Sequence, residues 1–144
     1  MFKEIKREDL NELVDIYIEA FNGEPWNDNW TYETASKRLE NMLDDSGFYG
    51  LKLIKDNEIV AFILGHEEQY YDGIMFNIKE FCVRKSIHGN NVGSKLLEEF
   101  EENLKERGVK EIVLMTKRHD KAEGFYNRRG YKTLEHLIFM SKEK

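Results

Sequence analysis

A strand that passes through a glycine- and asparagine-rich loop into a helix is the part of this sequence best suited to chemistry. The segment covers residues 78–97, and its loop, residues 88–93, reads His-Gly-Asn-Asn-Val-Gly. The first backbone N–H groups of a helix have no internal acceptors and lie at the positive end of the helix dipole, while glycine lets an anion approach closely. The segment therefore predicts a pyrophosphate site, although a short glycine loop before a helix can also be a simple tight turn.

The spacing of this loop disfavours two common nucleotide-binding motifs. It lacks the Gly-x-x-x-x-Gly-Lys-Ser/Thr pattern of a P-loop, and it does not open the chain as a dinucleotide-binding Gly-x-Gly-x-x-Gly would. Nucleotide hydrolysis and hydride transfer are therefore disfavoured.

Apolar periodicity predicts the elements that position the loop. The expected helices are residues 10–21, a helix capped by Thr31 and ended by Gly47, residues 92–107 before Gly108, and a short helix around Phe125 and Tyr126 that stops at Gly130. The expected strands are a first short one, residues 49–55 and 59–65 joined across Asp56 and Asn57, residues 75–83, residues 112–116, and residues 131–140 as a final strand or bent pair of strands. This order predicts an α/β or α+β sheet of mixed direction, with a parallel, right-handed crossover between the strands at 75–83 and 112–116.

The loop resembles the acyl-CoA loop of the GNAT superfamily of N-acetyltransferases, which reads Gln/Arg-x-x-Gly-x-Gly/Ala. His88 takes the Gln/Arg position and Asn91 the position of the first glycine. Asparagine is the non-glycine residue that best tolerates a left-handed backbone. A second match, Phe-Tyr-Asn-Arg-Arg-Gly-Tyr at residues 125–131, is similar to the family's Phe-Tyr-x-x-x-Gly-Phe/Tyr signature.

The resemblance implies a central mixed, mostly antiparallel sheet of six to seven strands flanked by four helices, in one N-acetyltransferase domain over residues 1–144. It also implies acetyl-CoA as the acetyl donor. The residues expected to bind coenzyme A are Phe81, Cys82, Val83, His88, Gly89, Asn90, Asn91, Val92, Gly93, Ser94 and His119. The family's tyrosine at the position of Tyr126 faces the CoA sulfur, and a phenol that is protonated near neutrality can donate to the departing thiolate.

Glu80 is the candidate general base, because an amine must lose a proton before it attacks the thioester. A carboxylate in an otherwise apolar strand is costly unless it is paired or near water, so an ion pair with Arg84 or a lysine is the alternative. Backbone amides near residues 81–83 would hold the oxyanion. Cys82 has no adjacent base in the sequence and is expected to pack rather than to accept the acetyl group.

Two segments combine aromatic side chains with carboxylates and are expected to bind the acceptor: residues 23–31 and the predicted turn at residues 67–72. Such walls suit a cationic amine. The candidates are Glu24, Trp26, Asp28, Trp30, Glu68 and Tyr71. The Pro25-Trp26 and Trp30-Thr31 pattern also resembles a subgroup similar to aminoglycoside 6'-N-acetyltransferases, while the alternative is that both tryptophans anchor the loop to the core.

Composition limits the partners. The 28 acidic and 22 basic residues give a formal charge of −6, which opposes binding to a nucleic-acid backbone and mildly favours a cationic substrate. No apolar run has the length of a membrane span, the amino terminus has no signal-peptide core, and the single cysteine requires no oxidising compartment, so a soluble, cytoplasmic protein is expected. The four histidines have no metal-ligand spacing, so no metal is expected.

Three functions remain open from the sequence: an N-acetyltransferase for a small cationic amine, a protein or peptide N-acetyltransferase, and a non-catalytic acyl-CoA-binding regulatory module. His88, Asn91 and His119 at family positions favour the third, whereas the presence of both Glu80 and Tyr126 opposes it. The sequence also leaves open whether the chain forms a homodimer.

Overall fold

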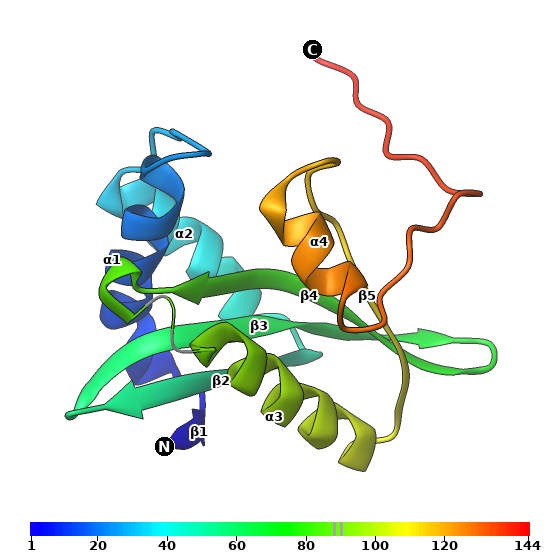
Figure 1. Cartoon of the computed structure of the whole chain (residues 1–144), viewed down its shortest axis with the longest axis horizontal. Helices are drawn as coiled ribbons and strands as arrows, with labels where there is room; N and C mark the ends of the chain where they lie inside the picture. The colour runs from blue at the N-terminus through cyan, green and yellow to red at the C-terminus, as the bar shows by residue number, and fades with distance from the viewer. Residues whose placement is uncertain (88, 90) are drawn as a thin grey trace. The chain divides into compact units, whose positions relative to one another are not determined.

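The computed structural model describes residues 1–87, 89 and 91–144. The chain divides into two compact units, residues 1–114 and residues 115–144, and each is described by itself. Figure 1 shows the course of the chain. No helix in the part of the chain that the structure describes is both long and apolar enough to cross a membrane.

The first unit contains a five-stranded mixed sheet in the order β1-β2-β3-β4-β5. The strands are β1 (Phe2–Glu4), β2 (Phe48–Lys55), β3 (Glu58–Tyr70), β4 (Gly73–Val83) and β5 (Val109–Leu114). The pairs from β1 to β4 are antiparallel, and β4 pairs with β5 in parallel. The predicted mixed, mostly antiparallel sheet and the predicted parallel crossover are therefore confirmed.

The predicted count of six to seven strands is wrong, because the described sheet has five. Residues 131–140 were expected to supply the remaining strands but contain none. A strand needs a neighbour for its backbone hydrogen bonds. The backbone hydrogen bond recorded between two residues of this segment is a turn contact, from the Leu137 N–H to the Leu134 carbonyl at 3.2 Å.

The described residues contain four α-helices. The first unit has α1 (Leu10–Asn22), preceded by the 3₁₀ turn η1 (Arg7–Asp9), α2 (Tyr32–Leu43) and α3 (Val92–Glu106), and the second unit has α4 (Lys121–Asn127). Each corresponds to a predicted helix, but the predicted end of the second helix at Gly47 is wrong, because α2 ends at Leu43. The Thr31 side chain accepts a hydrogen bond from the Thr34 N–H, which confirms Thr31 as the cap of α2.

The sheet of the first unit has helices on both faces (Figure 1). One core cluster joins residues of α1 and α2, such as Leu13 and Leu39, to Phe62 and Leu64 of β3. On the opposite face, Phe100 of α3 stacks on Tyr49 with ring centroids 5.4 Å apart. We call these the α1/α2 face and the α3 face.

The β3–β4 hairpin is longer than predicted. Residues 67–72 were expected to form a turn, but β3 continues to Tyr70 and the turn itself is confined to Tyr71 and Asp72. Within the first unit, the hairpin tip extends beyond α1, α2 and α3 (Figure 1).

Candidate active site

A β-bulge in β4 directs Glu80 toward the α1/α2 face. Glu80 pairs with Leu64 of β3, whereas Ile78 pairs with Gly65, so Lys79 is an extra residue on β4. Side chains alternate along a regular strand, and one inserted residue reverses the faces beyond it. Phe76, before the bulge, packs edge-on against Phe100 of α3, while Glu80, after it, meets α1 and α2.

Glu80 is buried and paired. Glu80 is 6% exposed, and its Oε2 accepts a 2.7 Å hydrogen bond from Nε of Arg38, a residue of α2. The ion pair expected with Arg84 or a lysine is therefore made by Arg38 instead. Arg84 donates to the Ile59 carbonyl and lies 3.6 Å from Glu19.

The surroundings of Glu80 shift the pKa of its carboxyl group. Burial raises the pKa of Glu80 above its ordinary value, against the hydrogen bond and charge of Arg38 and a hydrogen-bonding interaction with Tyr17, which lower it. Burial, and next the charge of Glu80, raise the pKa of the Tyr17 hydroxyl well above its usual range, so this group remains a proton donor in hydrogen bonds. The site thus holds a carboxylate whose affinity for a proton is higher than that of an exposed glutamate.

Aromatic side chains from α1 and the following loop lie beside this pair. The Trp30 ring meets Tyr17 edge-on at 5.1 Å, and the Arg38 guanidinium carbon lies 5.9 Å from the Trp30 ring centroid. Trp26 lies against Phe21 with ring centroids 5.8 Å apart. Trp26 and Trp30 are thus brought to the Glu80 side of the sheet.

The loop that carries the tryptophans is tied down at its end. The Asn22 side chain donates to the Trp30 carbonyl and accepts from the Trp30 N–H, both at 2.8 Å, and the indole N–H donates to Asp28 at 3.1 Å. Trp30 also packs against the core cluster. The anchoring role that was an alternative for Trp30 is therefore present, whereas Glu24 and Asp28 are exposed.

The amino terminus of α3 is the predicted pyrophosphate site. Asn91 precedes α3 in a left-handed conformation with φ 57° and makes no side-chain capping hydrogen bond, and Gly89 has φ +94°. Among the described residues, no heavy atom lies within 4 Å of where a Cβ on Gly89 would stand. Gly89, Asn91 and the first residues of α3, namely Val92, Gly93 and Ser94, are described, whereas His88 and Asn90 lie outside the described residues.

β4 extends past its parallel partner. The pairing of β4 with β5 ends at Ile78 and Leu114, and β4 continues to Val83. Phe81, Cys82 and Val83, the residues expected to run alongside the pantetheine, lie in this continuation. In Cys82, burial and next the charge of Glu80 raise the thiol pKa well above its ordinary value, which disfavours the thiolate that a nucleophile requires.

Two further predicted site residues lie in the second unit. Tyr126 of α4 has its ring edge-on to Phe125 and Tyr131, at 5.3 and 5.4 Å. His119 has φ 63°, and its backbone N–H donates a 2.6 Å hydrogen bond to Oε1 of Glu123. His119 therefore stands just before α4, in the position expected from the sequence.

Glu68 and Tyr71 lie at the hairpin tip, apart from the tryptophans. Between Gly73 and Glu80 there are about 23 Å of strand at 3.3 Å per residue, and Tyr71, which is 96% exposed, lies beyond Gly73. Glu68 faces His66 at 3.3 Å. The structure does not bring these two residues together with Trp26 and Trp30.

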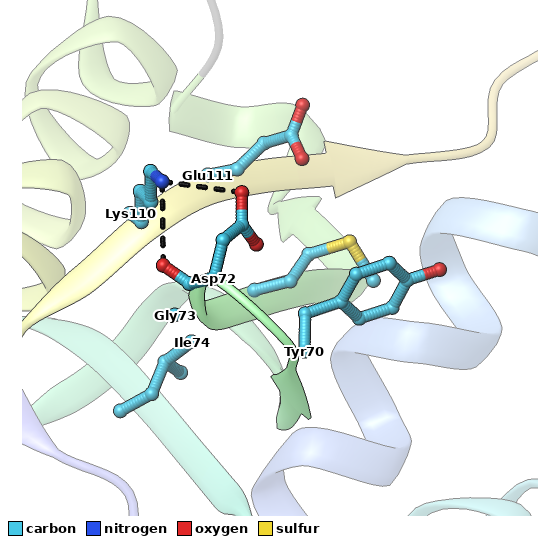
Figure 2. A pocket seen from close by; sticks show the side chains of 7 residues that line it. Tyr70, Asp72, Gly73, Ile74, Lys110 and Glu111 are labelled. Atoms are coloured by element: carbon cyan, nitrogen blue, oxygen red, sulfur yellow. Dashed lines mark hydrogen bonds and ion pairs between the residues drawn. The ribbon is translucent and has the colours of Figure 1, made fainter.

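A shallow pocket of about 280 Å³ is also found at the hairpin tip (Figure 2). Tyr70, Met75 and Glu111 line it, and Lys110 of β5 forms a 3.1 Å ion pair with Asp72 across its edge. Among the described residues no group of three His, Cys, Asp or Glu side chains is placed to hold a metal ion.

Arg38 and Tyr17 are the site residues that sequence reasoning missed. Tyr17 lies within the apolar periodicity that predicts α1, and this pattern indicates a core residue, as Tyr17 indeed is. Arg38 follows the buried Ala35 by three residues and precedes the buried Leu39, so helical spacing puts it beside the buried face of α2. That spacing was the available signal, but it does not identify Glu80 as the partner.

A family model for the acetyltransferase (GNAT) domain matches residues 8–140. No curated protein sequence matches the chain.

Three solved structures illustrate the shared fold. A transcriptional regulator from Bacillus halodurans C-125 has a TM-score of 0.80 at 20% identity, covering 99% of both chains. An aminoglycoside acetyltransferase from an uncultured soil metagenomic sample, in complex with sisomicin, has a TM-score of 0.73 at 16% identity, covering 99% of this chain and 96% of that one. A ribosomal-protein-alanine N-acetyltransferase from Brucella melitensis biovar Abortus 2308 has a TM-score of 0.76 at 13% identity, covering 100% and 99%.

At such identities these neighbours establish the fold and not the substrate. The family model, in contrast, spans nearly the whole chain, including both the α3 loop and the segment around Tyr126. The chain therefore belongs to the GNAT acetyltransferase family and is an N-acetyltransferase.

Proposed function

We propose that this enzyme transfers the acetyl group of acetyl-CoA by direct attack of a primary amine that belongs to a small, cationic substrate. The observation that carries the proposal is the buried Glu80 carboxylate, which lies beside an aromatic cluster on the α1/α2 face. A buried carboxylate with a raised pKa is suited to accept a proton from an ammonium group near neutral pH. An exposed glutamate would be a weaker base.

The chain offers a site for acetyl-CoA. Gly89, Asn91 and the amino terminus of α3 suit the pyrophosphate, because the backbone is open there and the asparagine side chain does not cap the helix. Phe81, Cys82 and Val83 would hydrogen-bond the pantetheine arm along β4 where β5 has ended, and His88, Asn90 and His119 would add contacts from their family positions. When bound, acetyl-CoA supplies an activated acetyl thioester.

The proposed roles of the side chains are complementary. Glu80 would take the proton from the ammonium, and backbone amides near Phe81 to Val83 would stabilise the negative charge that develops on the acetyl oxygen. Tyr126 would donate its hydroxyl proton toward the thiolate as the carbon–sulfur bond breaks. Cys82 takes no covalent part.

The acceptor would lie against the tryptophan loop. Trp26 and Trp30 offer aromatic faces for a cation, and Glu24 and Asp28 add negative charge. Glu68 and Tyr71 would reach only the distant part of an extended acceptor, because they lie at the hairpin tip. The aminoglycoside acetyltransferase among the structural neighbours supports a polyamino acceptor.

Release of free CoA, measured across polyamines, aminoglycosides, amino acids and basic peptides, tests this proposal. We expect turnover with a small polyamine or aminoglycoside. Acetylation confined to peptides would replace the proposal with a protein-modifying enzyme. Tight binding of acetyl-CoA without acetylation of any acceptor would replace it with a regulatory module.

The proposal includes one catalytic domain in the cytoplasm that forms a homodimer. The family match across residues 8–140 supports a single domain. A run of exposed apolar side chains at the carboxyl end, of which Ile138, Phe139 and Met140 are each 80% exposed, supports self-association.

A further inference from the structure

The Arg38–Glu80 pair joins two elements that are distant in sequence. Arg38 lies on α2, 42 residues before Glu80 on β4, and its Nε is 2.7 Å from Oε2. The Glu80 side chain is only 5% exposed, whereas the Arg38 side chain is 39% exposed. The carboxylate is thus inside the protein, whereas the side chain of its cationic partner is partly exposed to solvent.

Arg38 is held in place by the loop that precedes its helix. Its guanidinium carbon lies 5.9 Å from the Trp30 ring centroid, and Trp30 is fixed through its backbone by two hydrogen bonds to the Asn22 side chain. Thr31 then caps the first turn of α2. The same short segment therefore positions both an aromatic wall and the partner of the carboxylate.

We propose that Arg38 is a positioning residue for Glu80, and that the Trp30 ring restrains the Arg38 guanidinium. The loop at residues 23–31, which carries Trp30, therefore also sets the protonation state of the base. The inference rests on the proposed function, in which Glu80 accepts the proton of the acceptor amine. Arg38 does not touch the reacting atoms. It acts by fixing the direction of one carboxylate oxygen and by keeping the carboxylate ionised within a buried site.

Among the described residues, four titratable groups interact with Glu80. Arg38 comes from α2, Tyr17 from α1, and Lys79 and Cys82 from β4 itself. Arg38 is the cation in hydrogen-bond contact, so its removal should have the largest effect on the titration of Glu80. An opposite charge in contact with a carboxyl lowers its pKa by about 1–3 units.

The test compares Arg38→Gln, Arg38→Lys and the control Lys37→Gln, an exposed neighbour on the same helix. In a plot of kcat/KM against pH, we expect Arg38→Gln to shift the midpoint of the acidic limb to a pH that is higher by about one unit or more. At a given pH on that limb, kcat/KM is then about tenfold lower than in the wild type. Arg38→Lys keeps the charge but loses the planar guanidinium, so the midpoint of its acidic limb should lie close to the wild-type pH. Lys37→Gln should match the wild type.

A second measurement follows the Glu80 carboxyl carbon by NMR in ¹³C-labelled protein, with Glu80→Gln identifying the signal. We expect the titration midpoint to rise in Arg38→Gln and to stay near wild type in Arg38→Lys. An unchanged midpoint overturns the inference, as does a midpoint that moves without any movement of the kinetic limb in an active enzyme. If the wild type acetylates no amine, the proposed function fails, and the NMR midpoint alone then decides whether Arg38 controls Glu80.

Discussion

Glu80 is a residue whose position has an evident energetic cost. Burial of a carboxylate in a sheet is unfavourable unless hydrogen bonds and charge offset it. Here Arg38 and Tyr17 provide the offset from two helices. Burial still dominates, so the proton affinity is raised, which is the direction that general-base catalysis requires.

Replacing Glu80 with glutamine tests its role. We expect Glu80→Gln to lower kcat/KM near neutral pH by roughly 10²-fold, because general bases contribute factors of this order. The remaining activity should increase toward higher pH, since the amine must then lose its proton unaided. In the wild type the rate should rise with pH as Glu80 deprotonates, with a midpoint above the ordinary glutamate pKa because that pKa is raised.

The matched control is Glu58→Gln, which removes an exposed carboxylate at the start of β3. Equal rates for Glu80→Gln and the wild type across the pH range would contradict the base role. The Arg38 pair would then be a structural ion pair.

Tyr126 is tested by removing its hydroxyl alone. We expect Tyr126→Phe to reduce kcat about 10²-fold while the dissociation constant of acetyl-CoA changes little, because the hydroxyl acts on charge that appears only in the transition state. Rapid kinetics and calorimetry provide the two quantities. Tyr131→Phe, in the same aromatic cluster, is the control. An equal loss of binding and turnover would mark Tyr126 as a packing or binding residue.

At the scale of elements, the decisive features are the start of α3 and the bulge in β4. α3 begins directly after a left-handed asparagine whose side chain makes no capping hydrogen bond. The bulge at Lys79 sets which face of the sheet carries Glu80. The proposed donor and acceptor sites therefore both depend on local backbone geometry, one at the start of α3 and the other within β4.

The pyrophosphate site proposed at the amino terminus of α3 predicts that CoA binding is sensitive to a side chain at Gly93. We expect Gly93→Leu to abolish CoA binding in calorimetry, because a side chain there blocks the approach of a pyrophosphate to the backbone. Folding should persist, since leucine is favoured over glycine inside a helix by up to about 1 kcal/mol. Glu102→Leu places the same side chain on the exposed part of α3 and should bind CoA normally. Unchanged affinity in Gly93→Leu would remove the pyrophosphate assignment.

At the scale of the whole molecule, the exposed apolar run at the carboxyl end calls for a partner surface. Contiguous exposed apolar side chains are unusual in a soluble monomer. Residues 131–140, which include this run, were expected to form a final strand or a bent pair of strands, yet they form none in the structure.

We therefore expect the wild type to elute as a dimer in size-exclusion chromatography with light scattering. Phe139→Lys should shift it toward the monomer, because a charge in an apolar interface is costly. Ser141→Lys, an exposed neighbour just beyond the run, should leave the dimer intact. A monomeric wild type at high protein concentration would contradict the homodimer.

The sequence by itself determined the four helices, apart from the end of α2, and it predicted the anion loop. Apolar periodicity, the Thr31 cap and the glycine stops are local signals, and local signals survive in any tertiary context that does not oppose them. The left-handed backbone expected at Asn91 was found for the same reason. Glu80 was also recognisable as a candidate, because a lone carboxylate in an apolar strand needs an explanation.

Only the tertiary structure decided which side of the sheet Glu80 faces and what it meets there. Phe76, Ile78, Glu80 and Cys82 alternate as if they shared one face, and all four are buried. The extra residue at Lys79 reverses that pattern, and a bulge depends on pairing with β3 rather than on the sequence of β4 alone. The contacts of Glu80 with Tyr17 and Arg38 bridge distant parts of the chain, so no spacing within one element could have revealed them.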